Sequence, residues 1–201
     1  MLDSMSSGNP ATRARILGAA RALLERTPGA AVSMGQIARA AGVSRQALYL
    51  HFSDRAHLFV EVSRMADAAA RTPERQRRVD EARTARETLR EAIALQAALK
   101  PELRGIATAL DMLRRTDPAA DAAWSEREHA RLQRCEQVVT RLCAEGELAA
   151  AWQPDTAARL LWAATSQRVW DDLVVDQGWS TGQYRAHLTT MLESALLPAQ
   201  R

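Results

Sequence analysis

Residues 33–55 read SMGQIARAAGVSRQALYLHFSDR, and this stretch decides the fold. Ser33 and Gln36 form a capping box, in which the serine hydroxyl accepts a hydrogen bond from a first-turn amide and the glutamine side chain reaches back to the serine. A helix is therefore expected to begin after Ser33. Gly42 should end it, because glycine readily adopts the left-handed conformation that closes a helix. Ser44 is then the N-cap of a second helix.

Two short helices joined by this tight turn predict a helix-turn-helix. Ala38 lies four residues before Gly42, where a small side chain allows the two helices to approach closely. Val43 and Leu48 are expected to pack the second helix against the first.

The outward face of the second helix has the chemistry of a DNA-reading surface. We expect Leu48 and Phe52 to face inward. The 3.6-residue helical period then turns Arg45, Gln46 and Tyr49 outward near the helix start, which is the end that a recognition helix inserts into the major groove. Arginine can pair bidentately with guanine and glutamine with adenine. This face is therefore predicted to contact double-stranded DNA.

Other polar side chains are placed to contact the phosphate backbone. Hydroxyl and imidazole groups donate to phosphate oxygens, and free amides at helix N-termini favour an anion. The complete set of predicted DNA-binding residues is Ser33, Ser44, Arg45, Gln46, Tyr49, His51 and Arg55.

The charge of the chain is unevenly distributed. The 201 residues carry a formal net charge of +3, with 27 basic and 24 acidic side chains. Residues 1–60 contain seven arginines and three acidic residues, a net +4, so the remainder is nearly neutral. A basic first domain is expected if phosphate contacts are confined to it.

Residues 13–60 resemble the DNA-binding domain of TetR-type transcriptional regulators. The resemblance implies an N-terminal three-helix DNA-binding unit, a connecting helix, and a larger helical domain that binds a small molecule and dimerises through its last two helices. Arg55 stands where lysine is usual, and Leu50 stands where a polar residue is common, which leaves the operator sequence open. The positions that match the family pattern are Ile37, Ala38, Gly42, Val43, Ser44, Leu48, Tyr49, His51 and Phe52.

The expected fold is all-α. Alanine makes up about a fifth of the chain and is a strong helix former, whereas runs of β-branched residues are absent. We expect a flexible tail at 1–9, a helix-turn-helix domain at 10–54, a connecting helix at 55–72, and a helical effector-binding and dimerisation domain at 73–201.

Prolines suggest the helix boundaries of the last domain, because proline is favoured in the first turn and disfavoured in the interior. A separate helix is predicted to begin at Pro101. One further helix is predicted from Pro154 to Gly178, followed by a last helix after a second capping box at Ser180 and Gln183.

The C-terminal helices favour a homodimer. Each has more apolar surface than one neighbouring helix needs, which fits four-helix packing between two copies. A two-fold dimer would also place two recognition helices about 34 Å apart, or a multiple of it, on an inverted repeat. The predicted interface residues are Leu161, Trp170, Val174, Leu188 and Leu192.

A small-molecule effector site is expected in the same domain. Helices that contain tryptophan and methionine favour an apolar or aromatic effector, although no pair of residues has a spacing that dictates a ligand. The predicted lining residues are Asp111, Met112, Trp124, Arg127, His129, Trp162 and Gln167.

Two cysteines lie eight residues apart in one predicted helix. Their α-carbons would be about 12 Å apart, which exceeds disulfide reach. We expect Cys135 and Cys143 to be small apolar core residues, with a thiol sensor as the alternative.

The sequence lacks the motifs that are typical of other function classes. It contains no phosphate loop, dinucleotide fingerprint, HExxH, CxxC or GxSxG motif, so we expect no enzyme activity, no cofactor and no metal. No apolar stretch approaches the ~20 residues of a membrane span, so a cytoplasmic location is expected. The expected function is a ligand-responsive transcriptional regulator that binds DNA, and a repressor is favoured over an activator. The alternative is a helical ligand-binding or interaction protein of the same fold that does not read DNA.

Overall fold

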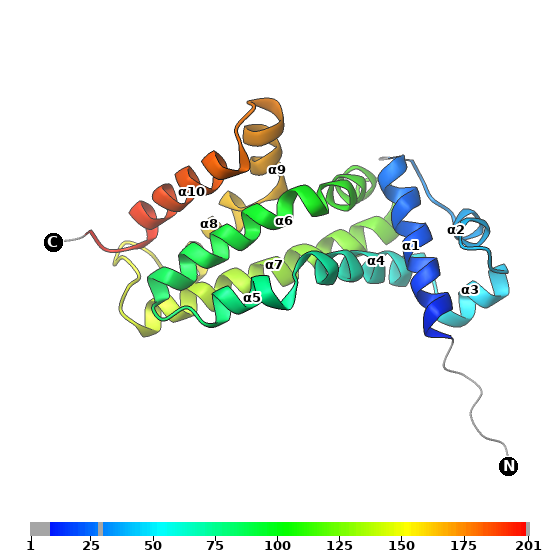
Figure 1. Ribbon diagram of the computed structural model, residues 1–201, viewed down its shortest axis with the longest axis horizontal. Coiled ribbons are helices and arrows are strands. Elements are labelled where there is room, and N and C mark those ends of the chain that lie inside the picture. The colour runs from blue at the N-terminus through cyan, green and yellow to red at the C-terminus, as the bar shows by residue number, and fades with distance from the viewer. Residues whose placement is uncertain (1–8, 28–29, 200–201) are drawn as a thin grey trace, which may run out of the picture. The chain divides into compact units, whose positions relative to one another are not determined.

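The computed structural model describes residues 9–27 and 30–199, and every regular element in these ranges is a helix (Figure 1). The predicted all-α fold is confirmed. The predicted tail at 1–9 lies outside the described residues, apart from Asn9. The helices are α1 (Pro10–Arg26), α2 (Met34–Ala40), α3 (Arg45–His51), α4 (Arg55–Ala70), α5 (Pro73–Asp80), α6 (Ala85–Leu113), α7 (Pro118–Ala144), α8 (Pro154–Ala164), α9 (Gln167–Trp170), the π-helix η1 (Asp171–Asp176) and α10 (Thr181–Leu196).

The chain divides into two compact units. The first contains the described residues up to Ala69 together with Leu103–Arg127. The second contains Ala70–Glu102 and the described residues from Glu128 onward. Helices α6 and α7 therefore each contribute to both units. In the described part of the chain, no helix is long and apolar enough to cross a membrane.

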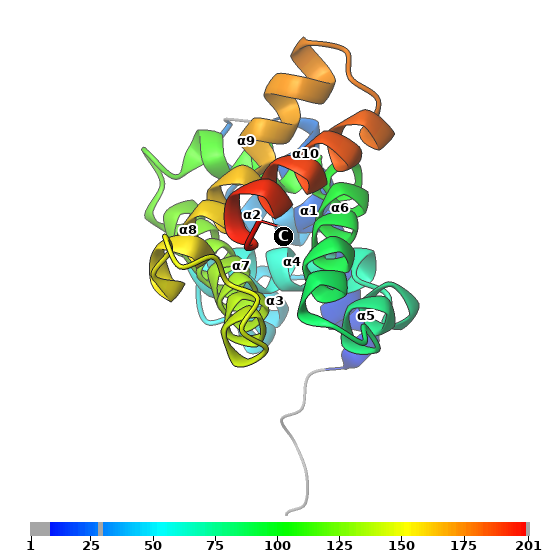
Figure 2. The ribbon, with the colours of Figure 1, turned by 90° about the vertical axis from the view of Figure 1, so that its left-hand side faces the viewer.

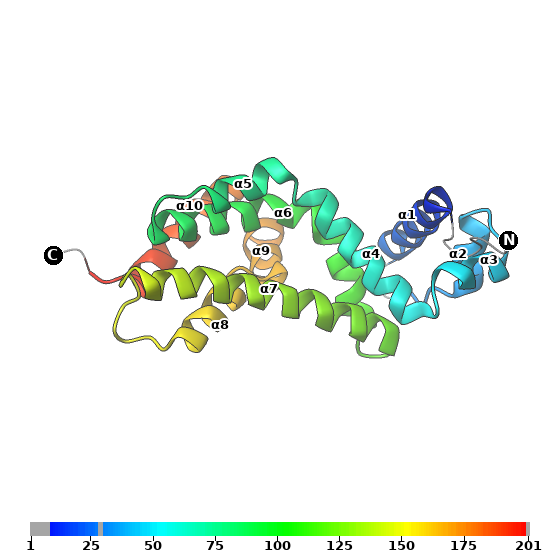
Figure 3. The same cartoon turned by 90° about the horizontal axis from the view of Figure 1, so that it is seen from below.

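The first unit contains the predicted helix-turn-helix. Helix α2 packs against α1 and α3 packs against α2 (Figure 3). The capping box is present, since Ser33 Oγ accepts from the Gln36 amide at 3.2 Å and Gln36 Oε1 accepts from the Ser33 amide at 2.8 Å. Gly42 has a φ of +63°, as the turn requires, and Ser44 Oγ accepts from the Ala47 amide at 3.0 Å. The local signals in this segment are confirmed.

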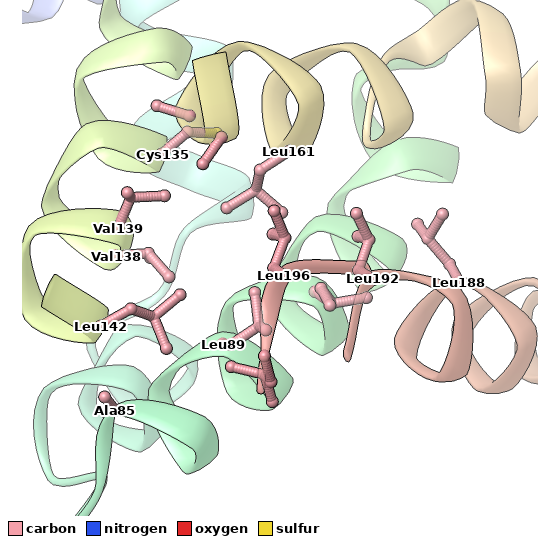
Figure 4. Packing of buried hydrophobic residues seen from close by; sticks show 14 of the residues in the cluster. Ala85, Leu89, Cys135, Val138, Val139, Leu142, Leu161, Leu188, Leu192 and Leu196 are labelled. Carbon is pink, nitrogen blue, oxygen red and sulfur yellow. The ribbon is translucent and has the colours of Figure 1, made fainter. Parts of the chain in front are cut away.

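The second unit is built around one apolar core, to which α6, α7, α8 and α10, labelled in Figure 2, contribute. Figure 4 shows how α7 contributes Cys135, Val138, Val139 and Leu142, facing side chains of other helices. The other labelled contributors are Ala85 and Leu89 of α6, Leu161 of α8, and Leu188, Leu192 and Leu196 of α10.

Helix α6 corrects the prediction that a separate helix begins at Pro101. The helix runs continuously from Ala85 to Leu113 with the proline inside it. A proline in a helix interior removes one backbone hydrogen bond and costs about 3 kcal/mol. Leu99, Leu103 and Ile106 are all at most 3% exposed, so burial of apolar side chains on both sides of the proline offsets that cost.

The prediction of a single helix from Pro154 to Gly178 is also wrong, because α8 ends before Thr165 and α9 begins at Gln167. The Thr165 hydroxyl donates to the Leu161 carbonyl at 2.7 Å, and Ser166 Oγ then accepts from the Val169 amide as a new N-cap. After α9 the backbone widens into η1, where the Gln177 amide donates to the Asp172 carbonyl five residues earlier. Side-chain competition for backbone groups thus divides the segment.

Candidate nucleic-acid interface

Helix α3 presents the polar face that the sequence predicted. Leu48 is fully buried, whereas Arg45 and Gln46 are exposed. Tyr49 is 48% exposed and Leu50 is 75% exposed. An exposed tyrosine and leucine beside two long polar side chains can contact base edges and thymine methyl groups.

Arg45 has a supporting neighbour that sequence reasoning missed. A Cβ added to Gly35 in the first turn of α2 would lie 3.7 Å from the Arg45 Cζ. The guanidinium therefore rests beside the α2 backbone at a position without a side chain. Gly35, which lies between Ser33 and Gln36 of the capping box, is the sequence feature that could have indicated a close approach of another side chain to α2.

Three other predicted DNA contacts lie near α3 but differ in their local bonding. The hydroxyls of Ser33 and Ser44 both accept hydrogen bonds from helix amides, and of the two the Ser44 hydroxyl still has its hydrogen to donate. The Ser33 hydroxyl also donates to Gln36 Oε1 at 2.8 Å. His51 is half-buried, with its ring centroid 6.4 Å from that of Phe52.

Arg55 is placed differently from the expectation of a phosphate contact. Its guanidinium lies 2.8 Å from the Asp117 carboxylate and 3.4 Å from the Val32 carbonyl. It also lies 5.8 Å from the centre of the Phe59 ring. The structure thus gives this side chain partners within the first unit, which compete with a phosphate for the same donors.

An ion pair joins α1 to α4 within the first unit. Arg13 pairs with Glu61 and lies 5.1 Å from the centre of the Phe52 ring. Arg64 lies 2.9 Å from Glu61 and 2.8 Å from Glu126. Hydrogen bonds from Arg13 and then Arg64 lower the pKa of the Glu61 carboxyl below its ordinary value. The charged groups therefore hold the elements behind the recognition helix in place.

The helix-turn-helix also matches a known protein family. Residues 16–62 match the family model described as "Bacterial regulatory proteins, tetR family". The matched range includes α2 and α3 completely, with most of α1 and the first half of α4. The helix-turn-helix of this chain is therefore similar to that of the tetR family of bacterial regulatory proteins.

Relatives of the TetR-type domain are themselves regulators. The HTH-type transcriptional regulator AcrR of Shigella flexneri is 40% identical over 57 residues, which are 28% of this chain and 26% of that protein. The chain thus matches about a quarter of the length of this curated relative.

Solved structures extend the likeness to the fold of the whole chain. NalD of Pseudomonas aeruginosa, the secondary repressor of the MexAB-OprM multidrug efflux pump, has a TM-score of 0.69 at 25% identity, with 94% of this chain and 98% of that chain covered. The regulator FadR from Bacillus subtilis, in complex with stearoyl-CoA, has a TM-score of 0.73 at 17% identity, with 90% and 98% covered. The chain therefore shares its fold with these two solved structures over at least 90% of its length.

The predicted effector residues are divided between the two units. Asp111, Met112, Trp124 and Arg127 belong to the first unit, and His129, Trp162 and Gln167 to the second. Asp111, Met112 and His129 are exposed, whereas Arg127 and Gln167 are buried. The structure does not bring the seven residues together in one unit, and their role as an effector site stays a prediction.

The predicted dimer residues are largely covered within their own unit, and their role in an interface stays a prediction. Leu161, Trp170, Leu188 and Leu192 are each at most 5% exposed and belong to the core of the second unit, and Val174 packs against that core. A side chain that is already buried in one copy has no surface left to bury in a dimer. Their apolar spacing was read correctly, but neighbouring helices of the same chain cover them.

Proposed function

We propose that the protein is a ligand-responsive transcriptional regulator that binds an inverted-repeat operator as a homodimer and is released from it by a small-molecule effector. The observation that carries this proposal is the exposed face of α3, with Arg45, Gln46 and Tyr49 outward on a TetR-type helix-turn-helix. We assign repression rather than activation, since the similar NalD is named a repressor.

The homodimer is proposed on exposed apolar side chains of the second unit. Val175 of η1 is 44% exposed and Met191 of α10 is 50% exposed. Deleting α10 would not test the dimer, because Leu192 and Leu196 are part of the core. A better test replaces Val175 and Met191 with glutamate and measures the mass in solution. A variant that keeps its helical content and remains a dimer would reject this surface.

Release by a ligand would occur by population shift. An effector that binds one conformation more tightly than the other moves the equilibrium by no more than that difference in affinity. In a dimer, such a shift can change the spacing of two recognition helices. The FadR structure holds stearoyl-CoA, which supports the idea that this fold can accommodate a small molecule.

The decisive experiment is selection of bound sequences from a random duplex pool by the full chain. We expect enrichment of an inverted repeat, whose symmetry would report the homodimer. A salt titration with the selected duplex should show a steep loss of affinity, because phosphate contacts release counterions. No enrichment together with salt-independent binding would instead favour a helical ligand-binding protein that does not read DNA.

A further inference from the structure

We infer that the effector is a small organic anion with a short apolar body, bound inside the second unit. Its charged group would lie near Arg134 and Arg71, and its apolar body would point toward Cys135 and Leu161. This inference gives a chemical class to the effector of the proposed function. The experiment below measures ligand binding without DNA, so that either idea can fail alone.

Two adjoining cavities carry the inference. The outer cavity has a volume of about 230 Å³ and the inner one about 30 Å³. Ala92, Gln96, Arg134 and Val138 line both of them, so the cavities meet at these four side chains. Because α6 and α7 supply all four, the two cavities adjoin between these two helices of the second unit.

The outer cavity is cationic. Arg71, Arg134 and Arg141 line it together with a single acidic residue, Asp80. The remaining polar lining consists of amides and one hydroxyl, supplied by Gln76, Gln96, Gln137 and Thr88. Arg141 is paired with Glu145 at 2.9 Å and donates to the Thr88 hydroxyl at 2.7 Å, so an anion that enters meets chiefly the guanidinium groups of Arg71 and Arg134, which suit a carboxylate or a phosphate.

A third cavity in the same unit provides a contrast. It is larger, at about 510 Å³, and is lined by three arginines and three glutamates. Its charges balance, so it offers an anion no net attraction. The excess of positive charge is therefore a property of the outer cavity and not of every hollow in this arginine-rich chain.

The inner cavity is apolar. Cys135 and Leu161 line it and are buried in the core of the second unit, at 7% and 2% exposed. The Thr165 hydroxyl also borders it but donates to the Leu161 carbonyl at 2.7 Å. Burial raises the pKa of the Cys135 thiol to about 11, against the nearby positive charges of Arg131, Arg134 and Lys100. A mainly apolar cavity thus adjoins the cationic one, with Arg134 lining both.

The size of the cavities limits the ligand. Pockets for drug-sized molecules usually measure about 300–1,000 Å³, which is more than the outer cavity provides. The expected ligand is therefore a small anion with a short chain or a single ring. This narrows the expected apolar or aromatic effector to one that also carries an anionic group, because basic residues outnumber acidic ones in the lining of the outer cavity.

The test is calorimetric titration of the full chain with three carboxylates, each paired with its uncharged amide of nearly the same shape. The probes are phenylacetate, benzoate and hexanoate, with phenylacetamide, benzamide and hexanamide as partners. We expect at least one carboxylate to bind about tenfold more tightly than its amide, the size of effect given by one desolvated charge-assisted contact. Phenyl phosphate then distinguishes a carboxylate site from a phosphate site.

Variants connect the preference to the cavity. Arg134→Gln should abolish the difference between carboxylate and amide, and Arg71→Gln provides a second variant if the first does not fold. Arg185→Gln is the matched control, because Arg185 is exposed and lines the charge-balanced cavity of the same unit. Circular dichroism confirms that each variant is folded.

Three results would overturn the inference. In the first, the carboxylates bind no more tightly than their amides. In the second, the preference for the carboxylate remains in both Arg134→Gln and Arg71→Gln. In the third, Arg185→Gln reduces that preference as much as Arg134→Gln does. If ligand-free protein still binds its selected duplex in these cases, the proposed function stands without this effector class. A carboxylate preference in a protein that binds no DNA would keep the site and reject the function.

Discussion

Arg55 and Asp117 join the start of α4 to the N-terminus of α7, with 2.8 Å between guanidinium and carboxylate. The same Asp117 Oδ1 accepts a hydrogen bond from the Ala119 amide at 3.0 Å, and the residue is only 5% exposed. One buried carboxylate therefore caps a helix and also holds the arginine that follows the recognition helix. In the first unit this fixes α4 beside the segment between α6 and α7.

Replacing Asp117 tests this relationship. Asp117→Asn keeps an oxygen for the cap and removes the charge facing Arg55, so the free energy of unfolding in urea should fall by about 2 kcal/mol. Asp121→Asn is the control, because Asp121 is an exposed acid in the first turn of the same helix and should cost only about 0.5 kcal/mol. Equal losses in the two variants would show that the ion pair contributes nothing.

Glu61 should make the stability of the first unit dependent on pH. Arg13 and Arg64 lower its pKa from the ordinary value of 4.5 in the folded protein. A lowered pKa contributes stability that is fully present above about pH 4.5 and is lost as the pH falls through the folded pKa.

Glu61→Gln should therefore lower the free energy of unfolding by about 1–2 kcal/mol at pH 7, and the difference from the wild type should shrink below pH 4.5. Urea unfolding at a series of pH values measures this difference. Glu136→Gln, at an exposed position of α7, is the control and should change little at any pH. A deficit that is constant across the series would contradict the electrostatic explanation.

The helix-turn-helix could be predicted from sequence because its determinants are local. Ser33, Gln36 and Ser44 cap helices within three residues of themselves, and Gly42 needs only its own backbone conformation. Helical spacing then decided which α3 side chains face outward. None of these steps required knowledge of a distant part of the chain.

Features set by distant contacts could not be predicted in the same way. The continuity of α6 through Pro101 depends on burial of the flanking leucines and isoleucine, and propensity alone predicted a break. Likewise, helical spacing identified Leu188 and Leu192 as apolar, but only the fold shows that their own unit covers them. The inner cavity of the second unit is lined by residues of α6, α7 and α8, and no spacing in the sequence indicates that these residues lie together.

Gly42 should be sensitive to a β-carbon for conformational reasons alone. Nothing lies within 4 Å of a Cβ added there, but the φ of +63° disfavours any L residue, so Gly42→Ala should destabilise the protein by about 1 kcal/mol. Gly18 lies in the interior of α1, also with no atom within 4 Å of an added Cβ. Gly18→Ala should instead stabilise the protein by about 0.5–1 kcal/mol in the same thermal unfolding assay. Effects of the same sign would refute this account.

The two cysteines should differ in reactivity. Cys135 is 7% exposed and burial raises the pKa of its thiol to about 11, whereas Cys143 is exposed. The expectation that both are core residues is confirmed only for Cys135. With a chromogenic disulfide reagent at pH 8, one thiol per chain should react quickly, and Cys143→Ser should remove that phase. Rapid labelling of the Cys143→Ser variant would show that Cys135 is accessible and would revive the thiol-sensor alternative.

Arg45 provides the sharpest test of base reading by α3. Arg45 is exposed, and its guanidinium lies beside the α2 backbone at Gly35. If it pairs with a guanine, Arg45→Ala should cost about 1–3 kcal/mol on the selected duplex and relax the preference at one base pair of each half-site. Arg115→Ala removes an exposed arginine of the same unit away from α3 and should leave that preference unchanged. Binding to a panel of single-substitution duplexes measures both variants, and an equal loss on every duplex with Arg45→Ala would mean that Arg45 contacts phosphate and reads no base.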